Sequence, residues 1–234
     1  MQKFLFTFVA AIFALACSIS ASAADEKTKI DDRLSNSANI IQELTGPNAT
    51  AGIPHNVLEG AKCIAVIPGM KQAGFIFGGH HGDGVATCKL ANGRWSPPAP
   101  FQLTGGSFGL QIGVESVDVV MMVMNDQGMQ SLESGHFKVG GELNAAAGPV
   151  GREGSAEAGW NAAILTYAKA KGVYGGVTIK GAELNQDKKA TEALYGSNAE
   201  FSQILNGQAP PTHDPAVHQF LATIHSAQAN AQAQ

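Results

Sequence analysis

Glycines interrupt a strand-forming segment of this chain and limit the folds it can adopt. Between Ala61 and Gly84 the sequence AKCIAVIPGMKQAGFIFGGHHGDG places short β-branched and aromatic runs between glycines. Such runs predict β-strands, and a glycine inside a strand marks a bulge, a bend or a close approach of two backbones. The segment therefore predicts paired, strongly curved strands rather than an active-site loop. We expect function to come from the surface of that sheet.

Period-two and short apolar runs extend this strand pattern along the chain. Strands are expected over seven ranges: Cys63–Ile67, Gly74–Phe77, Val85–Leu90, Phe101–Ile112, Val117–Met124, Phe137–Ala147 and Ile164–Ile179. The dipeptide Asn92-Gly93 favours a hairpin. Prolines at 97, 98 and 100 argue against a central strand at that point, because proline cannot donate a ladder hydrogen bond.

Helical spacing borders the strands on both sides. One amphipathic helix is expected from the apolar positions Ile30, Leu34, Ala38, Ile41 and Leu44, and it should stop at Gly46-Pro47. Shorter helices are expected near residues 53–61, 127–132, 188–194 and 200–205. A peripheral C-terminal helix carries the narrow stripe Val217, Phe220, Leu221 and Ile224, and the Ala/Gln-rich run that follows is expected to be disordered.

These elements together predict an α+β fold. Its centre would be a strongly curved, mostly antiparallel β-sheet, barrel-like or sandwich-like, flanked by N-terminal and C-terminal helices that cover its apolar faces. The expected core residues are Ile64, Val66, Phe75, Phe77, Val85, Ile112, Val119, Met121 and Val177.

The first 23 residues have the pattern of an export signal. Lys3 precedes a short apolar run, Phe4–Ala16, and the triplet Ala21-Ser22-Ala23 precedes an acidic segment. This pattern predicts cleavage after Ala23 and export to a bacterial periplasm or outer envelope, or secretion. An alternative stays open at Cys17, where Ala14-Leu15-Ala16-Cys17 loosely resembles a lipoprotein box that would make Cys17 the lipidated N-terminus.

Two cysteines remain beyond Cys17. Cys63 and Cys88 each lie in an expected strand of a chain expected to enter an oxidising compartment, so they are candidates for a disulfide. Two buried free thiols are the alternative, because free cysteine packs as a small apolar residue.

The charge balance excludes one class of partner. The chain carries 15 basic and 19 acidic residues, for a net charge of −4, and removing residues 1–23 takes away Lys3 and no acid. Proteins that neutralise many phosphates carry a basic surplus, so nucleic acid is not an expected partner. Binding to an anionic lipid would have to come from a local patch.

Two patterns that suggest chemistry are set aside. Gly105 to Gly109 satisfies G-x-S-x-G with Ser107, and Asp118 and His136 follow in hydrolase order, but the nucleophile turn needs a helix that this strand-like sequence does not predict. His80-His81-Gly82-Asp83 contains metal-ligand types, but adjacent residues of a strand point to opposite faces. We expect no catalytic residue, no metal site and no cofactor.

Several ordered motifs resemble the SYLF domain family, a lipid-binding and actin-associated domain of endocytic and exported bacterial proteins. The resemblance covers about Ala38 to Leu205 and depends on AKCIAVIPGMKQAGFIFGG, GDGVATC, GRWSPP, GLQIG, AAAGPVGR, YAKAKGVYGGVTIKG and LYG. The domains then expected are a signal peptide over 1–23, a leader with the start of the helix over 24–37, a SYLF-like domain over 38–207, and a peripheral helix with a disordered tail over 208–234.

The resemblance implies non-enzymatic binding of phosphoinositides or other acidic phospholipids at a membrane surface. The residues that match the family's basic positions are Lys71, Arg152, Lys169 and Lys171, and Ile30, Leu34, Ile41 and Leu44 would line the membrane side of the helix. For each cation the alternative is an ordinary solvated charge. The helix is a weak candidate for electrostatic attachment, because its basic residues alternate with acidic ones. A protein-interaction or envelope-structural module, with actin as one candidate partner, is the alternative function.

Overall fold

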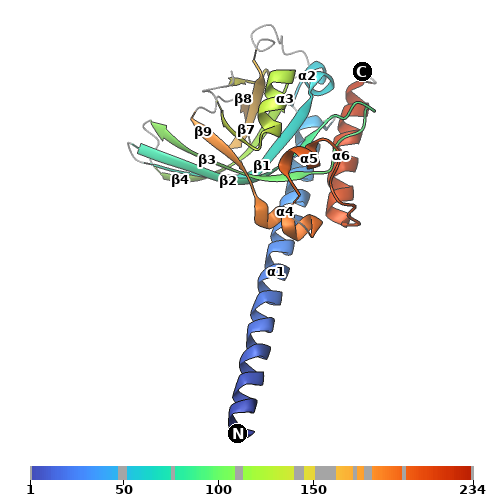
Figure 1. Cartoon of the computed structure of the whole chain (residues 1–234). Coiled ribbons are helices and arrows are strands. Elements are labelled where there is room, and N and C mark those ends of the chain that lie inside the picture. The colour runs from blue at the N-terminus through green and yellow to red at the C-terminus, as the bar shows by residue number, and fades with distance from the viewer. Residues whose placement is uncertain are drawn as a thin grey trace.

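A computed structural model of the chain describes residues 2–46, 52–74, 77–108, 113–139, 145–150, 162–170, 173–176, 181–196 and 199–232. It confirms the α+β architecture: a strongly curved, barrel-like sheet with helices at both ends of the chain (Figure 1). The helices are α1 (Gln2–Thr45), α2 (His55–Gly60), α3 (Asp126–Glu133), α4 (Lys188–Tyr195), α5 (Phe201–Leu205) and α6 (Pro215–Gln232).

The described strands form one nine-stranded sheet. They are β1 (Cys63–Gly74), β2 (Phe77–Cys88), β3 (Ala99–Phe108), β4 (Gly113–Val123), β5 (His136–Val139), β6 (Ala145–Ala147), β7 (Ile164–Ala170), β8 (Val173–Gly176) and β9 (Ala182–Gln186). Their order is β5-β9-β3-β2-β1-β4-β7-β6, with β8 also pairing with β7. All described pairs are antiparallel except β6 with β7.

Glycines bend this sheet as the sequence predicts. The register of β1 shifts between Val66 and Lys71 against β2, and Gly69 within that interval has a φ of 59°, which side-chain-bearing residues rarely adopt. A Cβ on Gly84 would lie 2.4 Å from the Phe101 ring. Glycine is therefore required at Gly69 by backbone conformation and at Gly84 by the close approach of the β3 side chain.

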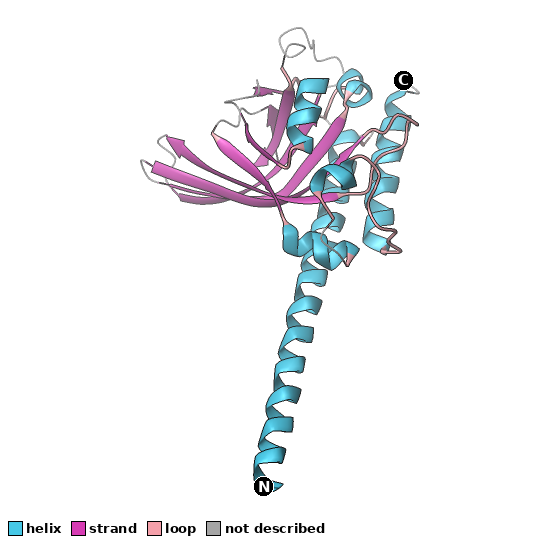
Figure 2. Ribbon diagram, in the orientation of Figure 1, coloured by secondary structure: helices cyan, strands magenta, loops and turns pink. Residues whose placement is uncertain are grey.

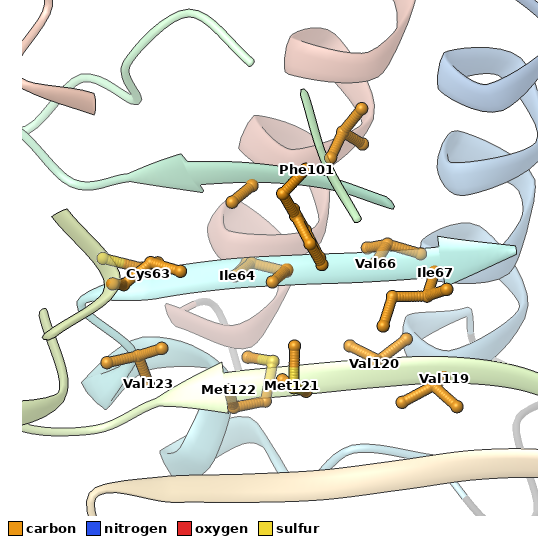
Figure 3. Close-up of a cluster of buried hydrophobic side chains, with 14 of the residues drawn as sticks. Cys63, Ile64, Val66, Ile67, Phe101, Val119, Val120, Met121, Met122 and Val123 are labelled. Carbon is orange, nitrogen blue, oxygen red and sulfur yellow. The ribbon is translucent and has the colours of Figure 1, made fainter. Parts of the chain in front are cut away.

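The core lies between the strands and the helices that cover them. Figure 3 shows β1 and β4 side chains gathered with Phe101 of β3. Five predicted core residues are confirmed with at most 1% exposure: Ile64, Val66, Val85, Val119 and Met121. The predictions at Phe75, Ile112 and Val177, and the side chain of Phe77, lie outside the described residues.

The disulfide alternative is confirmed over the free-thiol alternative. Cys63 and Cys88 are direct cross-strand partners on β1 and β2 and are bonded, with a sequence separation of 25. A cross-link over a loop of this length stabilises a fold by about 3 kcal/mol, mainly through the unfolded chain.

The strand boundaries differ from expectation at the glycine-rich turns. Gly74 and Phe77 belong to two different strands, the end of β1 and the start of β2, rather than to one separate strand. The strand β3 begins at Ala99, two residues earlier than expected, but at Pro100 it pairs only with β2, through Val85, so the expectation of no central strand at that point agrees with the register. Pairing of β3 with β9 begins only at Phe101, so the missing N–H of Pro100 removes no bond on that edge.

The two terminal helices pack side by side, and α1 lies against β1 and β2 of the sheet. The predicted amphipathic helix is confirmed within the longer α1, whose N-terminal half projects away from the sheet (Figure 2). The C-terminal segment differs from the expected disordered tail: α6 continues to Gln232 and packs on α1 and α2. Ala227 and Ala231 are buried there, and Trp95 Nε1 donates a hydrogen bond to Gln228 Oε1 at 3.0 Å. Among the described residues, no helix has the length and hydropathy that a bilayer crossing requires.

Candidate functional site

Strand register brings five polar residues to one face of the sheet. Lys71 of β1 pairs with His81 of β2 on one side and with Ser116 of β4 on the other, while Asp118 of β4 pairs with Lys169 of β7. Cross-strand partners share a face, and so do residues two apart in a strand. We call the face that carries Lys71, His81, Ser116, Asp118 and Lys169 the outer face.

Lys71 is the most available cation of this face. Its side chain is exposed, and its Nζ donates to Ser116 Oγ at 3.3 Å. No carboxylate of the described residues lies within ion-pair distance of it. Asp118, on the same face, accepts a hydrogen bond from the Gly69 N–H at 2.8 Å, so its charge is partly used to hold the bulge that precedes Lys71. Among the described residues, Lys71 is therefore a cation that no ion pair neutralises.

Lys169 is held differently. Its Nζ forms an ion pair with Glu43 of α1, and its side chain is only 24% exposed. A cation paired with a carboxylate offers less charge to an outside anion. Lys169 therefore contributes to attaching α1 to β7 as well as to the outer face.

The structure brings two of the four predicted cations, Lys71 and Lys169, to one face. Arg152 and Lys171 lie outside the described residues. Sequence reasoning missed His81 and Ser116 as neighbours of Lys71. Strand alternation in the sequence indicates that His80 and His81 point to opposite faces. It does not show that His81 is the partner of Lys71, because that pairing depends on the bulge at Gly69.

The rest of this face lies under α1. Arg33 of α1 is buried and donates to Asp187 Oδ2 at 3.0 Å and to the Gly84 carbonyl at 3.4 Å, and its guanidinium lies 3.9 Å from Asp83 Oδ2. These contacts anchor the helix over β2 and to the start of α4.

The apolar stripe of α1 faces the protein core. The residues expected on its membrane side, Ile30, Leu34, Ile41 and Leu44, are at most 1% exposed. In this arrangement they are packed against protein, and contact with a lipid would require α1 to leave the sheet. The side chain of Cys17 lies outside the described part of α1.

The two adjacent histidines point to opposite faces, as the strand alternation predicts. His81 is on the outer face, with Nε2 3.7 Å from Asp83 Oδ1. His80 is on the inner face, where its ring covers Gly105, and burial lowers the pKa of its imidazole. The described residues contain no cluster of three metal-ligating side chains.

The serine motif does not have hydrolase geometry in the described residues. Ser107 lies within β3, paired with Gly78, where a nucleophile would need a turn into a helix. Asp118 is on β4 and His136 is on β5, and four strands separate these two in the sheet. His136 Nδ1 instead lies 2.7 Å from Asn185 Oδ1. Ser107, Asp118 and His136 thus lie on three different strands and do not form a catalytic triad.

Comparison with known proteins gives a consistent set of relatives. The profile of the family described as "Ysc84: Las17-binding protein actin regulator" matches residues 104–227, more than half of the chain. Protein YSC84 of Saccharomyces cerevisiae is 34% identical over 189 residues, which cover 76% of this chain and 40% of the yeast protein. LAS seventeen-binding protein 3 of the same yeast is 35% identical over 189 residues, 76% of this chain and 41% of that protein.

A human relative extends the comparison. SH3 domain-containing YSC84-like protein 1 of Homo sapiens is 32% identical over 180 residues, covering 74% of this chain and 52% of the human protein. The chain thus spans about two fifths to one half of the length of these relatives.

Proposed function

The chain belongs to the Ysc84 (SYLF) family of actin regulators, and from this premise we propose that it is a non-catalytic module that binds acidic phospholipid head groups. Binding takes place on the outer face around Lys71, at a membrane surface. The observation that carries the proposal is the exposed Lys71 ammonium, which has a hydroxyl neighbour and no carboxylate partner among the described residues.

The wider charge pattern explains why such binding must be local. The whole chain has a net charge of −4, so long-range attraction to an anionic membrane is absent. Near an anionic leaflet a lysine contributes about 1 kcal/mol, and this attraction extends about one Debye length. A few cations on one face can therefore hold a head group only when the face is close to the bilayer.

Vesicle sedimentation of the full chain tests this proposal. We expect binding to phosphatidylcholine vesicles that contain about one third phosphatidylglycerol, and weaker binding as salt is added. Lys71→Glu should reduce that binding by roughly 10- to 30-fold, because the change replaces an attraction by a repulsion of similar size.

A charge reversal elsewhere is the matched control. Lys189→Glu alters an exposed lysine at the start of α4 and should leave vesicle binding within about twofold of the unmodified chain. Equal binding to neutral and acidic vesicles, insensitive to salt, would overturn the proposal. So would equal losses in the two variants.

A protein partner is the second candidate function. The family description names actin regulation and Las17 binding, and one of the yeast relatives is named LAS seventeen-binding protein 3. Co-sedimentation of the full chain with filamentous actin tests it directly, and pelleting that depends on actin and is unaffected by Lys71→Glu would favour this function over lipid binding.

The setting that we propose is export. The pattern from Lys3 to Ala23 supports removal of a signal peptide, with acylation of Cys17 as the alternative route to a membrane. In that setting phosphatidylglycerol and cardiolipin are the acidic lipids within reach.

A further inference from the structure

His81 is the residue on the outer face that neither the sequence motifs nor the family description assigns to a role. Its imidazole is 55% exposed, and its backbone is directly opposite Lys71 in the β1–β2 pair. Directly opposite residues of an antiparallel pair have Cβ atoms about 5 Å apart. One phosphate group can therefore contact both side chains.

We propose that His81 and Lys71, with the Ser116 hydroxyl, form a phosphate-binding site for a lipid head group, and that protonation of His81 strengthens it. This inference rests on the proposed function. It adds His81 to the lipid-binding site as a second cation, and it makes lipid binding depend on pH. Histidine is the side chain whose charge ordinarily changes between pH 5 and pH 8.

The physical reason lies in the pairing of two cations. Like charges directly opposite each other on a sheet are destabilising, and an anion between them removes the repulsion. A protonated imidazole and an ammonium are both donors without acceptor capacity, while the Ser116 hydroxyl can donate or accept. Phosphate oxygens, which accept several hydrogen bonds, match this donor set.

Asp83 is the acidic group nearest to His81 among the described residues. Asp83, two residues along β2, lies 3.7 Å from the imidazole, but its other oxygen faces Arg33 of α1 at 3.9 Å. The neighbour of His81 on β3 is the uncharged Thr104, whose partner on β9 is Glu183.

Glu183 is engaged further along the sheet. Its carboxylate lies 3.4 Å from His136 Nδ1, and Lys138 of β5 is its cross-strand partner. On the opposite side of Lys71, β4 contributes Ser116 and then Asp118, which accepts from Gly69. Asp118 and Glu183 thus each have a neighbouring donor, whereas Asp83 lies between Arg33 and His81 and is shared by the two.

Vesicle binding at two pH values tests the inference on the full chain. With vesicles of phosphatidylcholine and about one third phosphatidylglycerol at constant ionic strength, we expect binding at about pH 5.5 to exceed that at about pH 7.5 by roughly fivefold. The phosphodiester keeps its single charge over this range, so the change reports on the protein. His81→Gln should bind equally at both values.

His225→Gln is the matched control, because His225 is exposed on α6, and it should keep the full pH dependence. Wild-type binding that is equal at the two pH values, or a pH dependence that survives in His81→Gln, would overturn the role of His81 while leaving the proposed function intact. Absence of binding to acidic vesicles at both values would overturn the two together.

The source of the phosphate is tested by competition. Inorganic phosphate, added at ionic strength matched with chloride, should not release the protein from the vesicles if a head group in a membrane is the ligand. Release at matched ionic strength would show that the site takes a free phosphate, and would overturn the assignment to lipid.

Discussion

Neighbouring residues of one strand have opposite environments in this protein. His81 is exposed beside Lys71, whereas His80 is half-buried on the inner face, and its Nε2 has no hydrogen-bond partner among the described residues. The sequence His80-His81 contains this difference, because a strand alternates its faces. Which histidine points outward depends on the pairing of β2 with β1 and β3.

Acid should destabilise the fold through His80. Burial lowers the pKa of His80 below its ordinary value of 6.5, so below that value the unfolded chain takes up a proton that the folded chain does not. The free energy of unfolding should therefore fall as the pH decreases from about 7.5 to about 5.5. In urea unfolding, His80→Gln should lose less stability over this interval than the unmodified chain.

His225→Gln again provides the comparison, since that exposed histidine should leave the pH dependence of stability unchanged. If acidification lowers the unfolding midpoint of His80→Gln and of the unmodified chain by the same amount, the assignment of this effect to His80 is wrong.

At the scale of elements, α1 owes its position to both its apolar stripe and its charges. The helical period of Ile30, Leu34, Ile41 and Leu44 predicts a buried face, and that face packs in the core. Arg33, on the same helix, reaches across to Asp187, the residue that caps the N-terminus of α4. This ion pair joins segments 154 residues apart in the sequence, and no local pattern predicts it.

Removing Arg33 should loosen α1. Arg33→Met keeps most of the side-chain volume but leaves the Asp187 carboxylate buried without its partner, so we expect the free energy of unfolding to fall by about 3 kcal/mol. Denaturant unfolding measures this change. Lys29→Met, which removes an exposed ion pair with Asp25 on the same helix, should cost much less stability than Arg33→Met.

A double variant checks the mechanism. Asp187→Asn keeps an N-cap acceptor for the Ala190 N–H while removing the buried charge, so adding it to Arg33→Met should restore part of the lost stability. If the two substitutions are simply additive, the ion pair does not hold α1 in place.

At the scale of the whole molecule, the ends of the chain complete the fold. α6 packs on α1, and its last turns are held through Gln228 and Trp95, although the Ala/Gln-rich sequence there predicts disorder. The local sequence favours a helix only weakly, and burial of its side chains against other segments stabilises the helix there. Composition alone does not reveal that burial. The projecting part of α1 contains the region for which we propose removal.

Mass spectrometry of the mature N-terminus in the producing cell tests that processing. We expect a mass corresponding to a start at Ala24, because the A-x-A site precedes it. A diacylated or triacylated Cys17 would contradict this expectation and would supply membrane attachment independently of the outer face. A retained Lys3 would exclude both routes.

The sequence by itself determined the features that local physics controls. Strand and helix periods predicted the elements, and the basic motif positions included Lys71. The glycines within the strands predicted bulges, bends or close approaches in general, and the structure has these at Gly69 and Gly84. The sequence also identified Cys63 and Cys88 as a candidate pair.

Only the tertiary structure decided what depends on register and on distant partners. It placed His81 and Ser116 beside Lys71, paired Lys169 with Glu43, turned the α1 stripe toward the core and ordered the last turns of α6. A shift of one residue in a strand moves every side chain to the other face, and no local pattern records which strand will be the neighbour. The composition of the outer face is therefore a property of the assembled sheet.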